Sequence, residues 1–145
     1  MNGFSLNLIA AWAGILLGFV SGMVLGMFFH GENWLGGYAS FKRRMYRLGH
    51  ISLFGLGAVN LLFWLTAKNI STTSPLLVFA SWAFIIGAVT MPLCCALMAH
   101  VPKARLLFAV PVLSLIAGGA LTLTLVFSTG SPSAINHQLS TINQP

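Results

Sequence analysis

The chain has 145 residues, of which 57% are hydrophobic and only 6% are charged. Soluble globular domains carry about a quarter charged residues, so this composition excludes a water-soluble domain and indicates an integral membrane protein. Seven Lys and Arg residues stand against a single acidic residue, Glu32. This imbalance argues against catalysis by paired carboxylates and against a metal site built on Asp and Glu oxygens. Two cysteines are too few for a disulfide framework.

Four apolar stretches, at 5–29, 44–67, 76–99 and 105–128, are each close to the roughly 20 residues that cross a hydrocarbon core. Backbone polar groups in lipid must be satisfied within the chain, so each stretch predicts a helix. The first stretch is too long for a signal peptide and has no basic residue before it, which predicts a retained helix. We therefore expect an all-α fold in residues 1–130, an antiparallel bundle of four transmembrane helices.

The connections carry helix-start signals and set the packing of the last two helices. Ser74 followed by Pro75 is typical of a helix cap and first turn. The connection at 101–104 is so short that the third and fourth helices must be antiparallel neighbours. Pro92 lacks a backbone N–H inside the third stretch and predicts a kink there.

The basic residues predict the orientation of the bundle. Six of the seven lie in the connections after the first and third stretches, and only Lys68 lies on the opposite side. Short loops rich in Lys and Arg stay in the cytoplasm. The expected topology is therefore N-out/C-out, in the cytoplasmic (inner) membrane.

The first connection interleaves aromatic and basic side chains. The aromatic residues are Trp34, Tyr38, Phe41 and Tyr46, and the basic residues are Lys42, Arg43, Arg44 and Arg47. This composition is typical of a segment that lies at the membrane interface, and the four cations are candidates for binding anionic lipid headgroups. Nothing in the connection is long enough to form a nucleic-acid groove.

Residues 131–145 have a different character. They are polar, and Ile135-Asn136 recurs as Ile142-Asn143. This low-complexity sequence predicts a disordered tail, so we do not count His137 as a ligand.

Glycines recur every four residues in the first stretch, at Gly14, Gly18, Gly22 and Gly26. Each step of four turns a helix by about 400°, so the row forms a groove along one side. Such a glycine zipper lets another helix backbone approach closely, and close packing holds helices together in lipid. We expect the partner to be a helix of the same chain; oligomerisation is the alternative.

Three histidines fall in one leaflet of the expected topology. His30 ends the first span, His50 lies in the first turns of the second, and His100 ends the third. His50 shares a helix sector with Asn60, whose amide is costly to expose to lipid, so this sector is expected to face the bundle interior. His50 with His100 or His30 is therefore a candidate site for haem b or copper.

A row of sulfur-containing residues, Met91, Cys94 and Met98, forms a second candidate metal site on the third span. The same row is also typical of core packing, since Met fills gaps and Cys behaves as a small buried hydrophobe. Histidines near helix ends likewise commonly lie solvated at the interface. Both interpretations of these residues stay open on the sequence alone.

Three catalytic or transport functions are disfavoured. A proton-coupled exporter needs a carboxylate inside the membrane, but Glu32 lies in a connection. The chain has no Asp to orient a catalytic base, and adjacent Cys94 and Cys95 are not a Cys-x-x-Cys pair.

The sequence is consistent with two functions. The favoured one is a small multi-pass membrane protein without catalysis of its own, acting as a subunit or accessory protein of a membrane complex or as a homo-oligomer. The alternative is an electron-transfer membrane protein with a haem b or copper site on the cytoplasmic side.

Overall fold

A computed structural model describes residues 5–70 and 74–129. These residues form four long helices, α1 (Ser5–Phe28), α2 (Phe41–Asn69), α3 (Pro75–His100) and α4 (Ala109–Thr129), with short 3₁₀ segments at Trp34–Gly36 and Pro102–Phe108. All four are long and apolar enough to cross a membrane, the fourth when counted from Lys103. The predicted fold class, an all-α protein with four transmembrane helices, is confirmed. The expected tail at 131–145 lies outside the described residues.

The helix starts follow from capping and from proline. The Ser74 side chain accepts a hydrogen bond from the Leu76 N–H at 3.3 Å, and Pro75 is the first residue of α3, as the sequence predicts. Ser40 caps α2 by accepting from the Arg43 N–H at 3.2 Å. This cap starts α2 three residues before the expected boundary at 44, so the basic cluster lies on the first turns of α2.

The fourth helix starts later than expected. Residues from Pro102 to Phe108 form a 3₁₀ segment, and the α-helix begins at Ala109. Pro111 has no N–H and is tolerated in the first turn of a helix but not in its interior. An α-helix starting at 105 would have placed Pro111 in the interior, so the later start satisfies the backbone. In α3, by contrast, the helix continues through Pro92 to His100.

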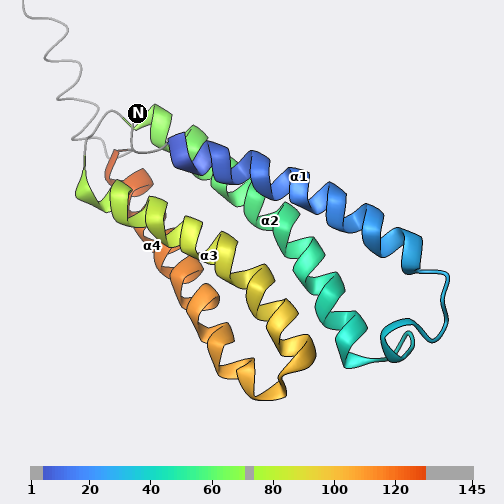
Figure 1. Ribbon diagram of the computed structural model, residues 1–145. Helices are drawn as coiled ribbons and strands as arrows, with labels where there is room; N and C mark the ends of the chain where they lie inside the picture. The colour runs from blue at the N-terminus through green and yellow to red at the C-terminus, as the bar shows by residue number, and fades with distance from the viewer. Residues whose placement is uncertain (1–4, 71–73, 130–145) are drawn as a thin grey trace, which may run out of the picture.

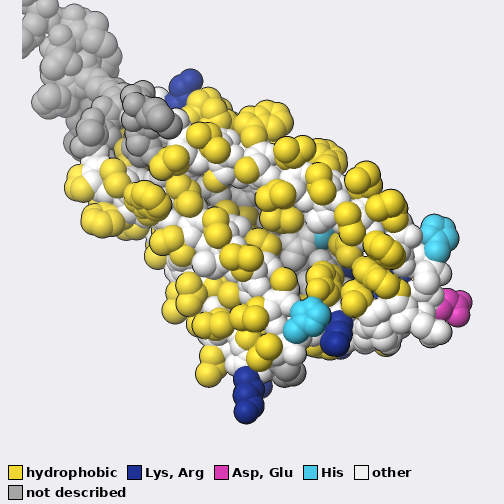
Figure 2. All heavy atoms as spheres, in the orientation of Figure 1, with side chains coloured by type: hydrophobic (Ala, Val, Ile, Leu, Met, Phe, Trp, Pro, Cys, Tyr) yellow, Lys and Arg dark blue, Asp and Glu magenta, His cyan; other side chains and the backbone are white. Residues whose placement is uncertain are grey.

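The helices pack in chain order, α1 on α2, α2 on α3 and α3 on α4, and neighbours run antiparallel (Figure 1). α2 and α3 are central, while α1 and α4 lie at the two outer sides (Figure 1). A compact core joins α2, α3 and α4 and consists of Phe63, Ala67, Leu77, Ala80, Phe84 and Leu125. Hydrophobic side chains cover the length of the helices and charged side chains lie at the ends (Figure 2), which is the surface of a multi-pass membrane protein.

Candidate functional site

The glycine row of α1 lies against α2 over three of its four positions. An ideal Cβ added at Gly14 would lie 2.9 Å from the Leu53 carbonyl oxygen, so the two backbones are in direct contact there. At Gly18 and Gly22 the added Cβ would lie 2.8 Å from the ring atoms of Phe54 and His50, respectively. Gly26 has nothing within 4 Å of an added Cβ. The groove therefore receives α2 of the same chain.

A buried polar network joins α1, α2 and α3 near the start of α1. Asn7 Nδ2 donates to Asn60 Oδ1 at 2.9 Å and to the Ser81 carbonyl at 3.3 Å, and Ser81 Oγ donates to Asn7 Oδ1. Asn60 Nδ2 donates to the Leu56 carbonyl at 2.9 Å. Asn7 and Asn60 are both 0% exposed. Asn60 was expected to face inward; Asn7 and Ser81 were not identified from the sequence, and the signal for Asn7 is an amide at the start of an otherwise apolar span.

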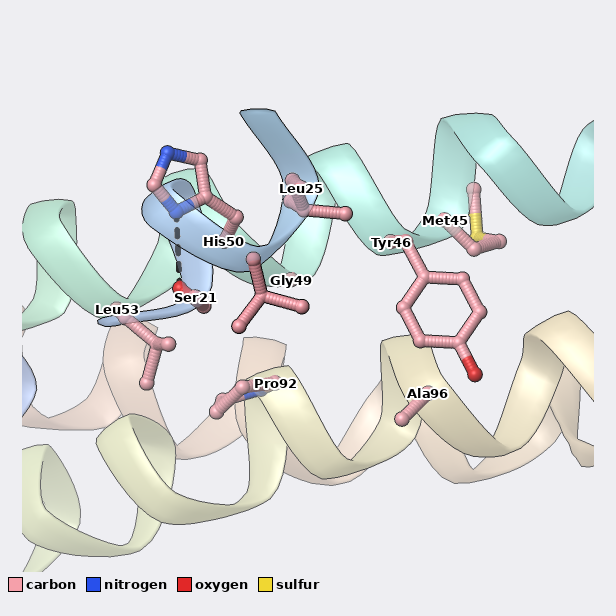
Figure 3. Close-up of a pocket in the computed structure, with 10 residues that line it drawn as sticks. Ser21, Leu25, Met45, Tyr46, Gly49, His50, Leu53, Pro92 and Ala96 are labelled. Atoms are coloured by element: carbon pink, nitrogen blue, oxygen red, sulfur yellow. Dashed lines mark hydrogen bonds between the residues drawn. The ribbon is translucent and has the colours of Figure 1, made fainter. Parts of the chain in front are cut away.

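Ser21 forms a hydrogen bond with His50 that joins α1 to α2. Ser21 Oγ lies 2.9 Å from His50 Nδ1 and 3.0 Å from the Gly18 carbonyl oxygen. Whether Nδ1 or the hydroxyl donates depends on the tautomer of the ring. Nε2 lies on the side of the ring away from Ser21 and Pro92 (Figure 3). The ring also contacts Phe54 edge-to-face, with centroids 5.4 Å apart.

The other two histidines have separate environments. His100 Nε2 lies 2.8 Å from the Tyr46 hydroxyl oxygen, and the two rings meet edge-to-face. His30 is exposed just after the end of α1. The structure therefore brings His100 to Tyr46 and His50 to Ser21. Within residues 5–70 and 74–129, no group of three or more His, Cys, Asp or Glu residues is placed to hold a metal ion.

Of the sulfur-containing residues Met91, Cys94 and Met98 on α3, Cys94 contacts the 3₁₀ segment that precedes α4. Cys94 is buried, and its thiol donates to the Leu107 carbonyl at 3.5 Å. Cys95 is 0% exposed, and Met91 and Met98 are half-buried. Pro111 has no N–H for the Leu107 carbonyl, which accepts from the Ala109 N–H and from the Cys94 thiol.

Arg43 lies apart from the other cations of the first connection. It is 0% exposed, with Cζ 3.8 Å from the ring centroid of Tyr38, 4.5 Å from that of Phe29 and 5.6 Å from that of Trp34. Nη2 donates to the Phe29 carbonyl at 2.9 Å, whereas Nε and Nη1 are buried without a hydrogen-bond partner. Of the four expected headgroup-binding cations, only Lys42, Arg44 and Arg47 are exposed. Arg43 instead holds the connection against the start of α2.

A recess lies between α1 and α3, with α2 as its floor (Figures 2 and 3). It consists of two adjoining cavities of about 360 Å³ each, which share Leu53 and Pro92. The cavity nearer the first connection includes Ser21, Tyr46, Gly49, His50 and Ala96 in its lining. The second, nearer the middle of the helices, is lined by aliphatic side chains and glycines only, apart from Pro92. Both linings lack a charged side chain.

Comparisons with protein families, with curated proteins and with solved structures find no match to this chain.

Proposed function

We propose that the chain is a small membrane protein without catalysis of its own, which acts as a subunit or accessory protein of a larger membrane complex. Its expected place is the cytoplasmic membrane, with both termini outside. The proposal rests on the hydrogen bonds that polar side chains form within the spans and on the positions of the glycines.

Two groups of hydrogen-bonding side chains within the spans join helices to one another. The network of Asn7, Asn60 and Ser81 joins α1, α2 and α3. The pair of Ser21 and His50 joins α1 to α2. In lipid such bonds hold a bundle together. These groups therefore serve to fix the arrangement of the helices, as a structural subunit requires.

The observation that carries the proposal is a pair of outward-facing glycines in helix interiors. Gly55 of α2 and Gly119 of α4 are exposed, and an added Cβ at either would meet nothing within 4 Å. A glycine inside a helix costs about 1 kcal/mol relative to alanine, and no described contact in this chain explains that cost. A closely approaching helix of another protein does explain it, because small residues let two backbones come together in lipid.

The test is the size of the native particle. An epitope-tagged chain at its natural expression level, extracted in mild detergent, should migrate as a discrete species larger than the purified chain. Gly55→Leu and Gly119→Leu should leave the helicity of the purified chain unchanged but remove the larger species. Ala109→Leu, an exposed position at the start of α4, is the matched control and should keep it. Migration of the wild-type chain as a monomer in membrane extracts would contradict the proposal.

A second candidate function, electron transfer through haem b or copper, is favoured by the contact between His50 Nδ1 and Ser21. Metal-ligating histidines usually donate their other ring N–H to an oxygen acceptor, which fixes the ring and leaves one nitrogen for the metal. With the proton on Nδ1, the Ser21 hydroxyl oxygen supplies that acceptor. Because His100 Nε2 is close to the Tyr46 hydroxyl and His30 is exposed beyond the end of α1, the second ligand would come from another copy or another subunit.

The visible spectrum of the purified chain tests this candidate. Cells supplied with haem and copper should yield protein with a reduced-minus-oxidised haem band or a stoichiometric copper content, and His50→Ala should abolish either signal. Ser21→Ala should weaken the signal without abolishing it, because it removes only the acceptor that orients the ring. Colourless, metal-free protein from such cells would rule the candidate out.

A further inference from the structure

We propose that the recess between α1 and α3 holds an anionic phospholipid of the surrounding bilayer. One acyl chain lies in the two adjoining cavities, and the phosphate lies near Lys42 at the start of α2 and His100 at the end of α3. Three observations carry this assignment: the length of the recess, its closure at one end, and the charge at the other.

The length of the recess matches one leaflet. Its lining on α2 extends from Met45 to Gly57, which is about 18 Å along a helix at 1.5 Å per residue. Half of a hydrocarbon core is about 15 Å thick. An acyl chain from one leaflet therefore fits the recess, whereas a transmembrane helix needs a groove through both leaflets.

The recess closes beyond its second cavity. There Asn7 of α1 bonds directly to Ser81 of α3, through the Ser81 carbonyl at 3.3 Å and the Ser81 hydroxyl. Toward the first connection, α1 and α3 diverge (Figure 1). The opening thus faces the leaflet in which the basic residues lie, and a chain entering from that leaflet ends near the middle of the bilayer.

The charge at the open end is complementary to a phosphate. A third cavity of about 530 Å³ lies at this end, and its lining includes Ser40, Lys42 and His100. Tyr46, which lines the neighbouring cavity, reaches His100 Nε2 with its hydroxyl at 2.8 Å. Basic residues at the cytoplasmic surface attract anionic lipids. A neutral quinone carries no charge that could pair with Lys42 at this end.

The experiment uses the full chain reconstituted into bilayers with equal amounts of phosphatidylglycerol and phosphatidylcholine. The protein is then extracted in mild detergent, and native mass spectrometry measures its mass together with any bound lipid. We expect one retained phosphatidylglycerol per chain. Lys42→Gln should reduce the preference for phosphatidylglycerol about fivefold, the effect of one basic residue at a membrane surface. Lys68→Gln, at the opposite end of α2, should leave the preference unchanged.

Two variants narrow the recess from different walls. Ala96→Leu acts from α3 and Val24→Phe from α1, and each should lose the retained lipid while keeping wild-type helicity. Ala120→Leu, exposed on α4, is the control and should retain it. The assignment is overturned if wild-type protein retains no lipid or shows no headgroup preference, or if a folded recess variant keeps the lipid. The headgroup preference of the wild-type protein tests the assignment even if both narrowing variants misfold.

Discussion

At the scale of single residues, Arg43 occupies an environment that only a guanidinium suits. A planar cation can stack on aromatic rings and still donate in its own plane. Arg43 does both, with three rings around Cζ and the Phe29 carbonyl at 2.9 Å from Nη2. Two of its nitrogens are left without hydrogen-bond partners, so the rings supply most of what compensates for the lost water.

Arg43→Lys should therefore loosen the first connection although the charge is kept. A lysine ammonium is a compact point charge that cannot stack in this way. We expect faster backbone hydrogen exchange at 30–40, measured by mass spectrometry in detergent. Arg44→Lys, at an exposed position, is the control and should leave exchange unchanged; equal rates in the two variants would show that the rings do not hold the connection.

Asn60→Ala should destabilise the bundle. The substitution removes the acceptor of Asn7 Nδ2 and opens a space at a side chain that is 0% exposed. Hydrogen bonds between membrane helices contribute about 1–2 kcal/mol at most, so a loss of about that size is expected in the free energy of unfolding by denaturing detergent. Asn69→Ala removes an exposed amide that bonds only within its own helix and should have little effect. Equal stability of the two variants would show that the network contributes nothing.

At the scale of elements, the contact between α1 and α2 predicts a graded response to added methyl groups. Gly14→Ala places a carbon 2.9 Å from a backbone oxygen, which cannot move without moving α2. Overpacking of this kind costs about 1–3 kcal/mol. Gly26→Ala meets nothing within 4 Å and should gain up to about 1 kcal/mol of helix propensity.

Thermal unfolding of the two glycine variants in the same detergent provides the comparison. The midpoint should fall for Gly14→Ala and stay level or rise for Gly26→Ala. The reverse order would mean that the two helices do not approach as closely as the structure has them.

The helices could be predicted from the sequence because span length and apolar composition are local properties. The positions of the helix ends were harder to predict, because each depends on a single residue whose effect is set by its neighbours. Ser40 caps α2 only because the connection turns at Leu35, Gly36 and Gly37, all of which have positive φ. Pro111 delays α4 because an α-helix that started at 105 would place a residue without an N–H in its interior.

The candidate site was less predictable because its contacts are not periodic. Helical spacing indicated that Asn60 faces inward, but it could not name its partners, which are Asn7, 53 residues away, and the Phe84 carbonyl, 24 residues away. Burial of Arg43 was not predictable for the same reason, since Phe29 lies 14 residues before it. The expectation that three histidines share one end did not identify their neighbours, and the structure pairs His50 with Ser21 and His100 with Tyr46.

At the scale of the whole molecule, the distribution of basic residues predicts both termini outside. In a chain with Cys94→Ser and Cys95→Ala, a cysteine at Ala39 should react with a membrane-impermeant maleimide only after permeabilisation. A cysteine at Asn69, on the opposite side, should react in intact cells. Both positions are exposed, so access depends on the side of the membrane. The opposite labelling pattern would invert the topology.

The bond between Asn7 and Ser81 also bears on the order in which the protein is made. α1 leaves the ribosome first, but its buried amide meets Asn60 only 53 residues later and Ser81 only 74 residues later. Until α3 has entered the bilayer, the first span carries an amide with incomplete partners, which is costly in hydrocarbon. The first span therefore reaches its full set of hydrogen bonds only when the third span has entered the bilayer.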